Sequence, residues 1–173
     1  PGTTYANNAA YDFTADLTLY AQWTAISYTV TYANGGGIGT LPTELNKNYE
    51  QSFTLASGST LSKTGSSISG WNDGTSNYSV STTYAMPASN VTLTAQWEAV
   101  SYTITYANGG GSGMLPIQGN KEYTQTFSVA SGSALTKSGY TFAGWNSATD
   151  GKGTSFAANA SKAFDGEDLN FYA

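Results

Sequence analysis

Carboxylates are the first side chains to consider for chemistry, because the chain has eleven of them but no histidine and no cysteine. A glycoside hydrolase needs two carboxyl groups that face each other across a cleft, one of them with a raised pKa. No carboxylate here lies in an apolar strand at a position shared by the internal repeats described below. The nearest, Glu50 and Glu122, are not equivalent, because Thr124 is the counterpart of Glu50. The sequence therefore predicts no catalytic residues.

Two glycine-rich segments, Asn34–Gly39 and Asn108–Gly113, have the composition of ligand-binding loops. A phosphate-binding loop needs Gly-Lys-Ser/Thr at the start of a helix, and a dinucleotide loop also needs a following helix. Leu-Pro follows both segments, so glycines that form tight turns are the better interpretation. The glycines that we assign to these structural turns are Gly35, Gly36, Gly109 and Gly110.

A calcium site is the alternative for the segment Asp150–Gly153, which has Asn146 nearby. The segment lacks the alternating Asp or Asn ligands and the distal Glu of an EF-hand loop. We therefore predict a structural turn that contains Gly151 and Gly153, and no metal or cofactor.

Composition excludes several other classes of protein. Without histidine and cysteine the chain cannot form Cys₂His₂ or His₃ zinc sites, a Ser–His or Cys nucleophile system, or a redox dithiol. A net charge of −5 and the absence of arginine argue against a nucleic-acid partner. No apolar run of about 18 residues is present, so no membrane insertion is expected in this segment.

An internal repeat organises the chain. The motif that begins at Tyr28 recurs at Tyr102, 74 residues later, and residues 28–74 match residues 102–148 at 27 of 47 positions. The sequence Ala-Gln-Trp closes at Trp23 and at Trp97 with the same period. We interpret the chain as part of a longer protein with three pieces: 1–23, the C-terminal part of a preceding repeat; 24–97, a complete repeat; and 98–173, a second repeat truncated at its last strand.

Each repeat has the pattern of β structure. Apolar and polar residues alternate in Tyr28–Tyr32, in Val91–Trp97 and in Leu17–Trp23, which predicts strands. No long stretch has a period of 3.6 residues, and the only short helical candidates surround Leu61 and Leu135. We therefore predict a mainly β fold with at most short helices.

A complete repeat is long enough to bury one small core, so we predict beads on a string rather than a solenoid. The connectors Thr24–Ser27 and Glu98–Ser101 contain no Gly or Pro, which indicates stiff linkers. The aromatic side chains that we assign to the structural core are Trp23, Trp71, Trp97, Trp145, Tyr28, Tyr102, Phe53 and Phe127.

Three motifs in a fixed order resemble the Listeria–Bacteroides repeat family: GYTFAGWN at 139–146, TDGKGTSF at 149–156 and LTLYAQW at 17–23. The resemblance covers essentially the whole chain. It implies tandem β-grasp (ubiquitin-like) modules in exported or surface-attached bacterial proteins, and it implies no catalytic residues. In such a module the first and last strands are parallel neighbours, so the chain enters and leaves at opposite ends. The middle repeat departs from the pattern, with Ser66 and Ile68 in place of Tyr140 and Phe142.

Two functions agree with these observations. In the first, the segment is a non-catalytic stalk or spacer that projects an adhesive or other distal domain, and its partners are the neighbouring repeats. In the second, the repeats themselves bind a host protein or a glycan, which would require exposed aromatic or charged residues shared by both repeats. We favour the spacer, located outside the cell, either on the bacterial surface or secreted.

Overall fold

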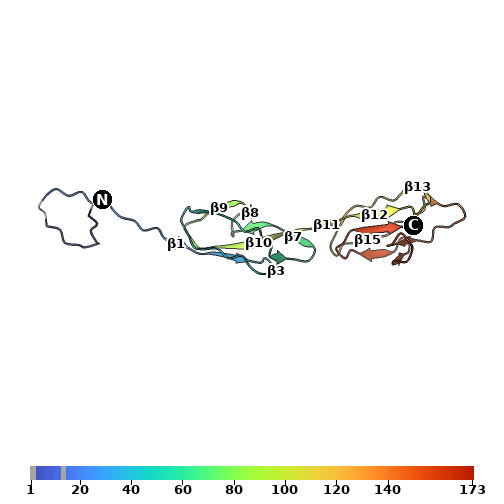
Figure 1. Cartoon of the computed structure of the whole chain (residues 1–173), viewed down its shortest axis with the longest axis horizontal. Coiled ribbons are helices and arrows are strands. Elements are labelled where there is room, and N and C mark those ends of the chain that lie inside the picture. The colour runs from blue at the N-terminus through green and yellow to red at the C-terminus, as the bar shows by residue number, and fades with distance from the viewer. Residues whose placement is uncertain (1–2, 13–14) are drawn as a thin grey trace.

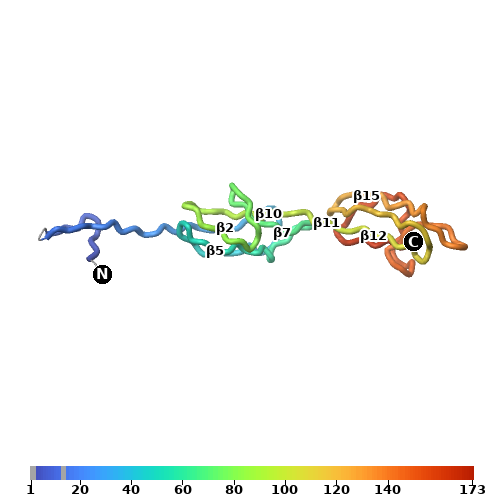
Figure 2. The backbone as a smooth tube through the Cα atoms, turned by 90° about the horizontal axis from the view of Figure 1, so that it is seen from above, coloured from blue at the N-terminus to red at the C-terminus, as the bar shows by residue number. Residues whose placement is uncertain are grey.

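The computed structural model describes residues 3–12 and 15–173, so residues 1–2 and 13–14 of the predicted preceding repeat lie outside it. Two β modules follow one another along the long axis of the molecule, and an extended segment precedes them (Figure 1). The view from above gives the same end-to-end arrangement (Figure 2). Both modules are built from short strands with the same pairing pattern.

The first module contains strands β1 (Ser27–Tyr28), β2 (Val30–Ala33), β3 (Ile38–Gly39), β4 (Lys47–Asn48), β5 (Ser52–Thr54), β6 (Leu61–Ser62), β7 (Ser66–Asn72), β8 (Asn77–Ser79), β9 (Thr83–Ala85) and β10 (Val91–Ala99). The second contains β11 (Ser101–Tyr102), β12 (Ile104–Ala107), β13 (Ser112–Gly113), β14 (Lys121–Glu122), β15 (Thr126–Ser128), β16 (Leu135–Thr136), β17 (Trp145–Asn146), β18 (Ser155–Phe156), β19 (Ser161–Ala163) and β20 (Leu169–Tyr172).

A four-stranded sheet is the centre of each module, in the order β2-β10-β7-β8 in the first and β12-β20-β17-β18 in the second. The first and last long strands of a module are parallel neighbours: Val30 pairs with Val91, and Ile104 pairs with Leu169. The parallel strand starts at Val30 rather than at Tyr28 as predicted, because Tyr28 belongs to β1 and pairs with Lys47 of β4.

The predicted fold class, mainly β, is confirmed, and no helix occurs in the described residues. The helical candidates were wrong: Leu61 and Leu135 each begin a two-stranded pairing, with Gly39 and Gly113 respectively. A β-grasp fold packs a helix across its sheet, so the β-grasp assignment is not confirmed. The described part of the chain has no helix long and apolar enough to cross a membrane.

The predicted four-residue connector Glu98–Ser101 is not a separate linker. Strand β10 continues to Ala99, which pairs with Ser66 of β7, and β11 begins at Ser101. Only Val100 stands between the last strand of one module and the first strand of the next. The two modules are therefore joined by nearly continuous strand.

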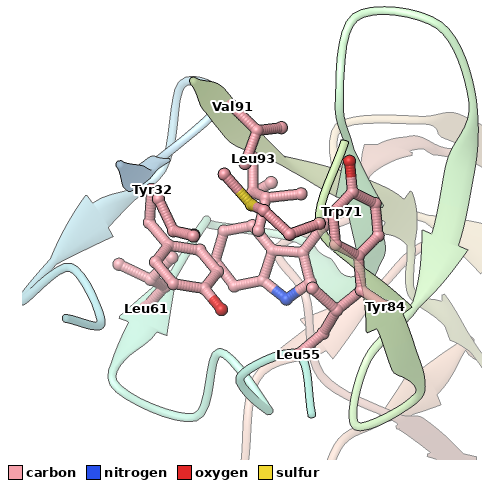
Figure 3. Close-up of a cluster of buried hydrophobic side chains, with 10 residues drawn as sticks. Tyr32, Leu55, Leu61, Trp71, Tyr84, Val91 and Leu93 are labelled. Carbon is pink, nitrogen blue, oxygen red and sulfur yellow. The ribbon is translucent and has the colours of Figure 1, made fainter. Parts of the chain in front are cut away.

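Each module has a core of its own. The first core surrounds Trp71 (Figure 3) and the second surrounds Trp145. The buried residues of the first are Val30, Tyr32, Leu55, Leu61, Trp71, Tyr84, Met86, Val91, Leu93 and Ala95. Those of the second are Ile104, Tyr106, Phe127, Val129, Trp145, Phe164 and Phe171.

The prediction of a strand and a core position at Leu17–Trp23 was wrong. No strand forms there in the described residues, and the side chain of Trp23 is 92% exposed. Its counterpart Trp97 packs on the glycine-rich turn of its own repeat and pairs with Ile68. The equivalent turn and strand for Trp23 would precede residue 1 of this sequence, so their contacts are not available to it.

Candidate functional site

The described residues contain no convergent group of chemically active side chains. In residues 3–12 and 15–173, no three acidic residues lie close enough to hold a metal ion. Asp73 accepts hydrogen bonds at Oδ1 from the N–H groups of Thr75 and Ser76, both at 2.8 Å, and at Oδ2 from the hydroxyl of Tyr84 at 3.1 Å. Desolvation raises the Asp73 pKa, but these hydrogen bonds together outweigh it and lower the pKa below its ordinary value. This carboxylate is therefore used to close a turn.

The segment Asp150–Gly153 is held as a turn by Asn146. The Asn146 Nδ2 amide donates to the carbonyl oxygens of Gly151 and Gly153, each at 3.1 Å. The Asp150 carboxylate accepts from the N–H of Lys152 at 3.0 Å. These hydrogen bonds from Asn146 and to Asp150 hold the segment closed as a turn.

The glycine-rich turn of the first module holds the end of β10. The N–H of Gly37 donates to the Asn34 carbonyl at 3.0 Å, and Trp97 Nε1 donates to the same oxygen at 2.9 Å. Gly35 has φ +57°, and a Cβ atom there would overlap the carbonyl oxygen of Ala95. A Cβ atom on Gly37 would overlap the Trp97 ring. The glycines therefore let β10 and its tryptophan approach the turn closely.

Trp97 consequently lies half-buried against this turn and packs at the margin of the first core. In the second module Gly109 and Gly110 form the same turn, with φ +56° and +82°, and a Cβ atom on Gly109 would overlap the carbonyl oxygen of Ala173. Gly36 has φ +86° at the equivalent position of the first module.

Trp71 is the centre of a polar contact inside the first core. Its indole is 0% exposed, and its Nε1 donates to the Ala56 carbonyl at 2.7 Å. The hydroxyl of Tyr32 accepts from the Ala56 N–H at 3.2 Å, and the two rings pack edge to face, with centroids 4.6 Å apart. Both backbone polar groups of Ala56 are therefore satisfied by buried aromatic side chains.

The second module repeats this arrangement with Trp145, Tyr106 and Ala130. Trp145 is 1% exposed and donates to the Ala130 carbonyl at 2.7 Å, while the Tyr106 hydroxyl accepts from the Ala130 N–H at 3.0 Å. Phe142 packs against Trp145 at 5.1 Å between centroids, but Tyr140 is exposed. Of the two aromatic residues that the middle repeat lacks, only Phe142 therefore contributes to a core.

The remaining predicted core residues lie at the margins of the two clusters. Phe127 is buried, whereas Tyr28, Phe53 and Tyr102 are half-buried and pack against their clusters. In the first module, sequence reasoning missed an ion pair between Lys47 and Glu44, 2.9 Å apart.

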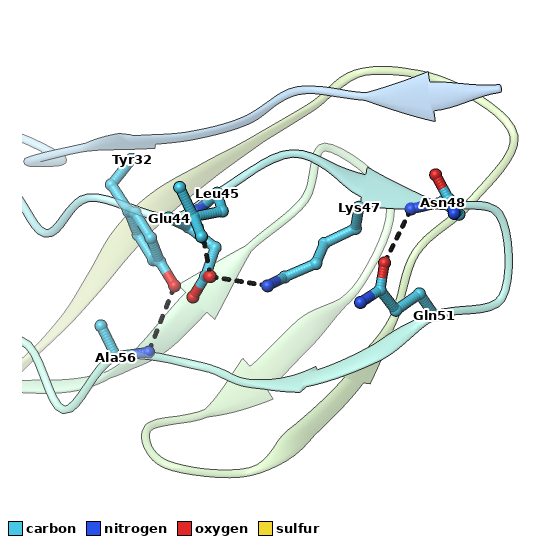
Figure 4. A network of polar contacts seen from close by, with 7 residues as sticks. All are labelled: Tyr32, Glu44, Leu45, Lys47, Asn48, Gln51 and Ala56. Carbon is cyan, nitrogen blue, oxygen red and sulfur yellow. Dashed lines mark hydrogen bonds and ion pairs between the residues drawn. The ribbon is translucent and has the colours of Figure 1, made fainter.

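The ion pair lies beside the Tyr32 hydroxyl (Figure 4). Desolvation is the main cause of the raised Tyr32 pKa, and Glu44 adds to it. The signal in the sequence was a Glu and a Lys three residues apart, which is common enough on any surface to carry little information.

The parallel strand pair is the feature that connects the two ends of each module. Beside its backbone ladder, the Thr31 hydroxyl bonds to the Thr92 hydroxyl at 2.9 Å and donates to the Val91 carbonyl at 3.2 Å. In the second module the Thr105 hydroxyl bonds to the side chain of Asn170. Side-chain hydrogen bonds thus reinforce both pairs on their exposed faces.

A side-chain oxygen caps the start of each parallel pair. The N–H of Thr29 donates to Asn90 Oδ1 at 2.9 Å, and the N–H of Thr103 donates to Asp168 Oδ1 at 2.7 Å. The hydrogen bond from Thr103 lowers the Asp168 pKa below its ordinary value.

We expect acid to weaken the second module at this cap. Because the Asp168 pKa is lower in the folded chain, its contribution to stability is present above the unfolded-state pKa of about 3.9 and is lost as the pH falls through the folded value. Asp168→Asn should remove this acid-sensitive part, and Asn90→Asp should introduce one into the first module. Melting of each module, followed by NMR at neutral pH and at about pH 3, measures both effects. Identical acid sensitivity in wild type and Asp168→Asn would contradict the expectation.

The fold and its contacts define tandem all-β modules whose shared residues form cores and turns. Comparison with known proteins agrees: residues 28–96 and 102–173 match the Listeria-Bacteroides repeat domain, in two copies. The chain belongs to the Listeria–Bacteroides repeat family.

Two curated relatives come from Evansella cellulosilytica. One, named "Putative membrane protein", is 31% identical over 171 residues, which is 95% of this chain and 25% of the relative. The other, named "Putative Gly-rich membrane protein", is 31% identical over 156 residues, 84% of this chain and 18% of the relative. The chain thus spans a quarter or less of the relatives' length. No solved structure matches the chain significantly.

Proposed function

We propose that this segment is a non-catalytic spacer in a bacterial surface or secreted protein, and that it holds a further domain away from the cell. One observation carries the proposal: the parallel pairing of β2 with β10 and of β12 with β20. Parallel neighbours begin at one pole of a module and finish at the other, so each repeat adds length. The end-to-end arrangement of the modules supports this role (Figure 2). The relatives named as membrane proteins support a location at the cell envelope.

The binding alternative has less support. A ligand surface shared by the repeats would need exposed equivalent aromatic residues. Most shared aromatic side chains instead pack in or against the two cores, among them Tyr32 and Tyr106, and Trp71 and Trp145. Tyr49 and Tyr123 are an exposed equivalent pair, and the contacts of Tyr123 are described below.

A spacer under tension loads the parallel pair in shear, so that its hydrogen bonds must break together. The chain has no cysteine, so pairs of new cysteines provide unique attachment points for single-molecule pulling. Ser27→Cys with Glu98→Cys loads β2 and β10 of the first module in shear. Ser27→Cys with Ser89→Cys pulls the same two strands apart from one end, because both sites precede the strand starts. We expect the first pair to need a several-fold higher unfolding force.

The two cysteine pairs share one folded module and differ only in the direction of force. Thermal melting of both variants controls for changes in stability. Equal unfolding forces in the two directions, or unfolding in shear at forces that the instrument cannot distinguish from baseline, would contradict the spacer proposal.

A further inference from the structure

The junction between the modules contains a specific contact besides the strand connection. The N–H of Val100 donates to the Gly65 carbonyl at 3.0 Å, which ties the connector to the turn before β7. Gly65 has φ +68° and is the third residue of the turn in which the Ser66 N–H donates to the Lys63 carbonyl at 3.0 Å. This turn therefore lies at the exit pole of the first module, where the second module begins.

Tyr123 of the second module packs directly on that glycine. A Cβ atom on Gly65 would lie 2.7 Å from Tyr123 Cγ, too close for any residue other than glycine. The opposite part of the Tyr123 ring approaches Gly166 of its own module, where an added Cβ atom would be 3.2 Å from Cδ2. The tyrosine thus fills the space between two glycines, one from each module.

The repeat places the same two residues in both modules, but at the two outer ends no further module in the described part of the chain faces them. Tyr49 is the counterpart of Tyr123, and it is 58% exposed where Tyr123 is 39% exposed. Gly139 is the counterpart of Gly65, with φ +78° in an equivalent turn, and a Cβ atom there would meet nothing within 4 Å. Each outer pole of the pair of modules therefore carries one half of the contact.

We propose that the Gly65–Tyr123 contact is a joint that makes successive repeats tumble as one body, and that Gly139 and Tyr49 are open halves of the same joint, each shaped for another copy of this repeat. Because Gly139 and Tyr49 are the counterparts of the two residues that already meet between the modules, the partner expected at each is another copy of the repeat. A following repeat would bring its tyrosine to Gly139, and the end of a preceding repeat would bring its glycine to Tyr49. This proposal extends the proposed spacer function. The joint rests on the contact between modules, however, and does not depend on how strongly each module resists force.

NMR relaxation of backbone amides in the full chain tests the formed joint, because it reports the tumbling of each module. In wild type we expect the two modules to share one rotational correlation time. Gly65→Ala and Tyr123→Ala should each abolish this sharing, and the modules should then give separate, shorter values. Gly139→Ala and Tyr49→Ala are the matched controls, since they make the same changes where no partner is present. They should leave the shared value intact.

The open half is tested in an extended chain, in which a second copy of residues 96–173 follows Ala173. This copy restores the missing Gln-Trp and supplies the connector and a third module. Gly139→Ala should now uncouple the third module, although it has no effect in the 173-residue chain. The pulling experiment measures the pairing of β2 with β10 and does not require the Gly65–Tyr123 contact, so either proposal can fail alone. Independent tumbling in wild type, or equal effects of Gly65→Ala and Gly139→Ala in the 173-residue chain, would overturn the joint.

Discussion

Trp71→Ala should lower the free energy of unfolding of the first module by about 3–5 kcal/mol, the range for a large aromatic residue removed from a core. The indole is completely buried, and its loss also leaves the Ala56 carbonyl without its donor. A module of this length is expected to have only about 4–11 kcal/mol of stability in total. We therefore expect the first module to be largely unfolded, while the second remains folded. Trp145→Ala should have the converse effect.

NMR spectra and denaturant titrations of the full chain measure this effect for each module separately. Trp23→Ala is the matched control, because the same side chain is removed from a position that is 92% exposed. Surface substitutions of this kind usually change stability by no more than about 0.5 kcal/mol. Wild-type stability of Trp71→Ala, or an equal loss in Trp23→Ala, would refute the importance of the buried indole.

Gly35→Ala should destabilise the first module by roughly 2–5 kcal/mol, from left-handed backbone strain of about 1–2 kcal/mol and the displacement of a packed neighbour at about 1–3 kcal/mol. The new methyl group would overlap the Ala95 carbonyl, so the turn must move away from β10. That movement would also disturb the hydrogen bond from Trp97 to Asn34.

Gly74→Ala separates the two contributions to this loss. Gly74 has φ +94°, but an added Cβ atom there meets nothing within 4 Å, so only backbone strain is introduced. We expect chemical denaturation to show a clearly smaller loss for Gly74→Ala than for Gly35→Ala. Equal losses would mean that the close approach of β10 to the glycine turn has no energetic importance.

The parallel strands and the mainly β class could be predicted because they depend on local alternation and on the repeat. Residues 28–33 alternate, and the same pattern returns 74 residues later, so two independent copies of the signal agree. The position of Trp71 was predictable for the same reason. Its hydrogen bond to Ala56 was not, because Ala56 lies 15 residues earlier in the chain, before strand β6 and the turn that leads into β7, and local periodicity does not place it beside Trp71.

Other features depend on contacts that local pattern does not contain. An isolated apolar residue such as Leu61 is compatible with either a helix or a strand. Its pairing with Gly39, which is distant in the sequence, makes it a strand residue. Trp97 and Trp23 both follow Ala-Gln at the end of an alternating segment, but only Trp97 packs on a glycine turn. The contact of Tyr123 with Gly65 joins two repeats, and a reading of either repeat alone gives no sign of it.

The shortness of the junction also has a consequence for how the chain finds its fold. Strand β2 can pair only after β10 is available, and the first residue of β10, Val91, lies 61 residues after Val30. The central sheet of a module therefore depends on a long-range contact that forms late in folding. Until then the similar strands of the neighbouring repeat are available as wrong partners, and such exchange is a common misfolding route in tandem repeats. Parallel pairing needs a crossover of about a dozen residues or more, yet only residues 100–103 separate β10 from β12. The closing strand of one repeat therefore cannot pair in parallel with the opening strand of the next, and the short junction excludes this one exchange between neighbouring repeats.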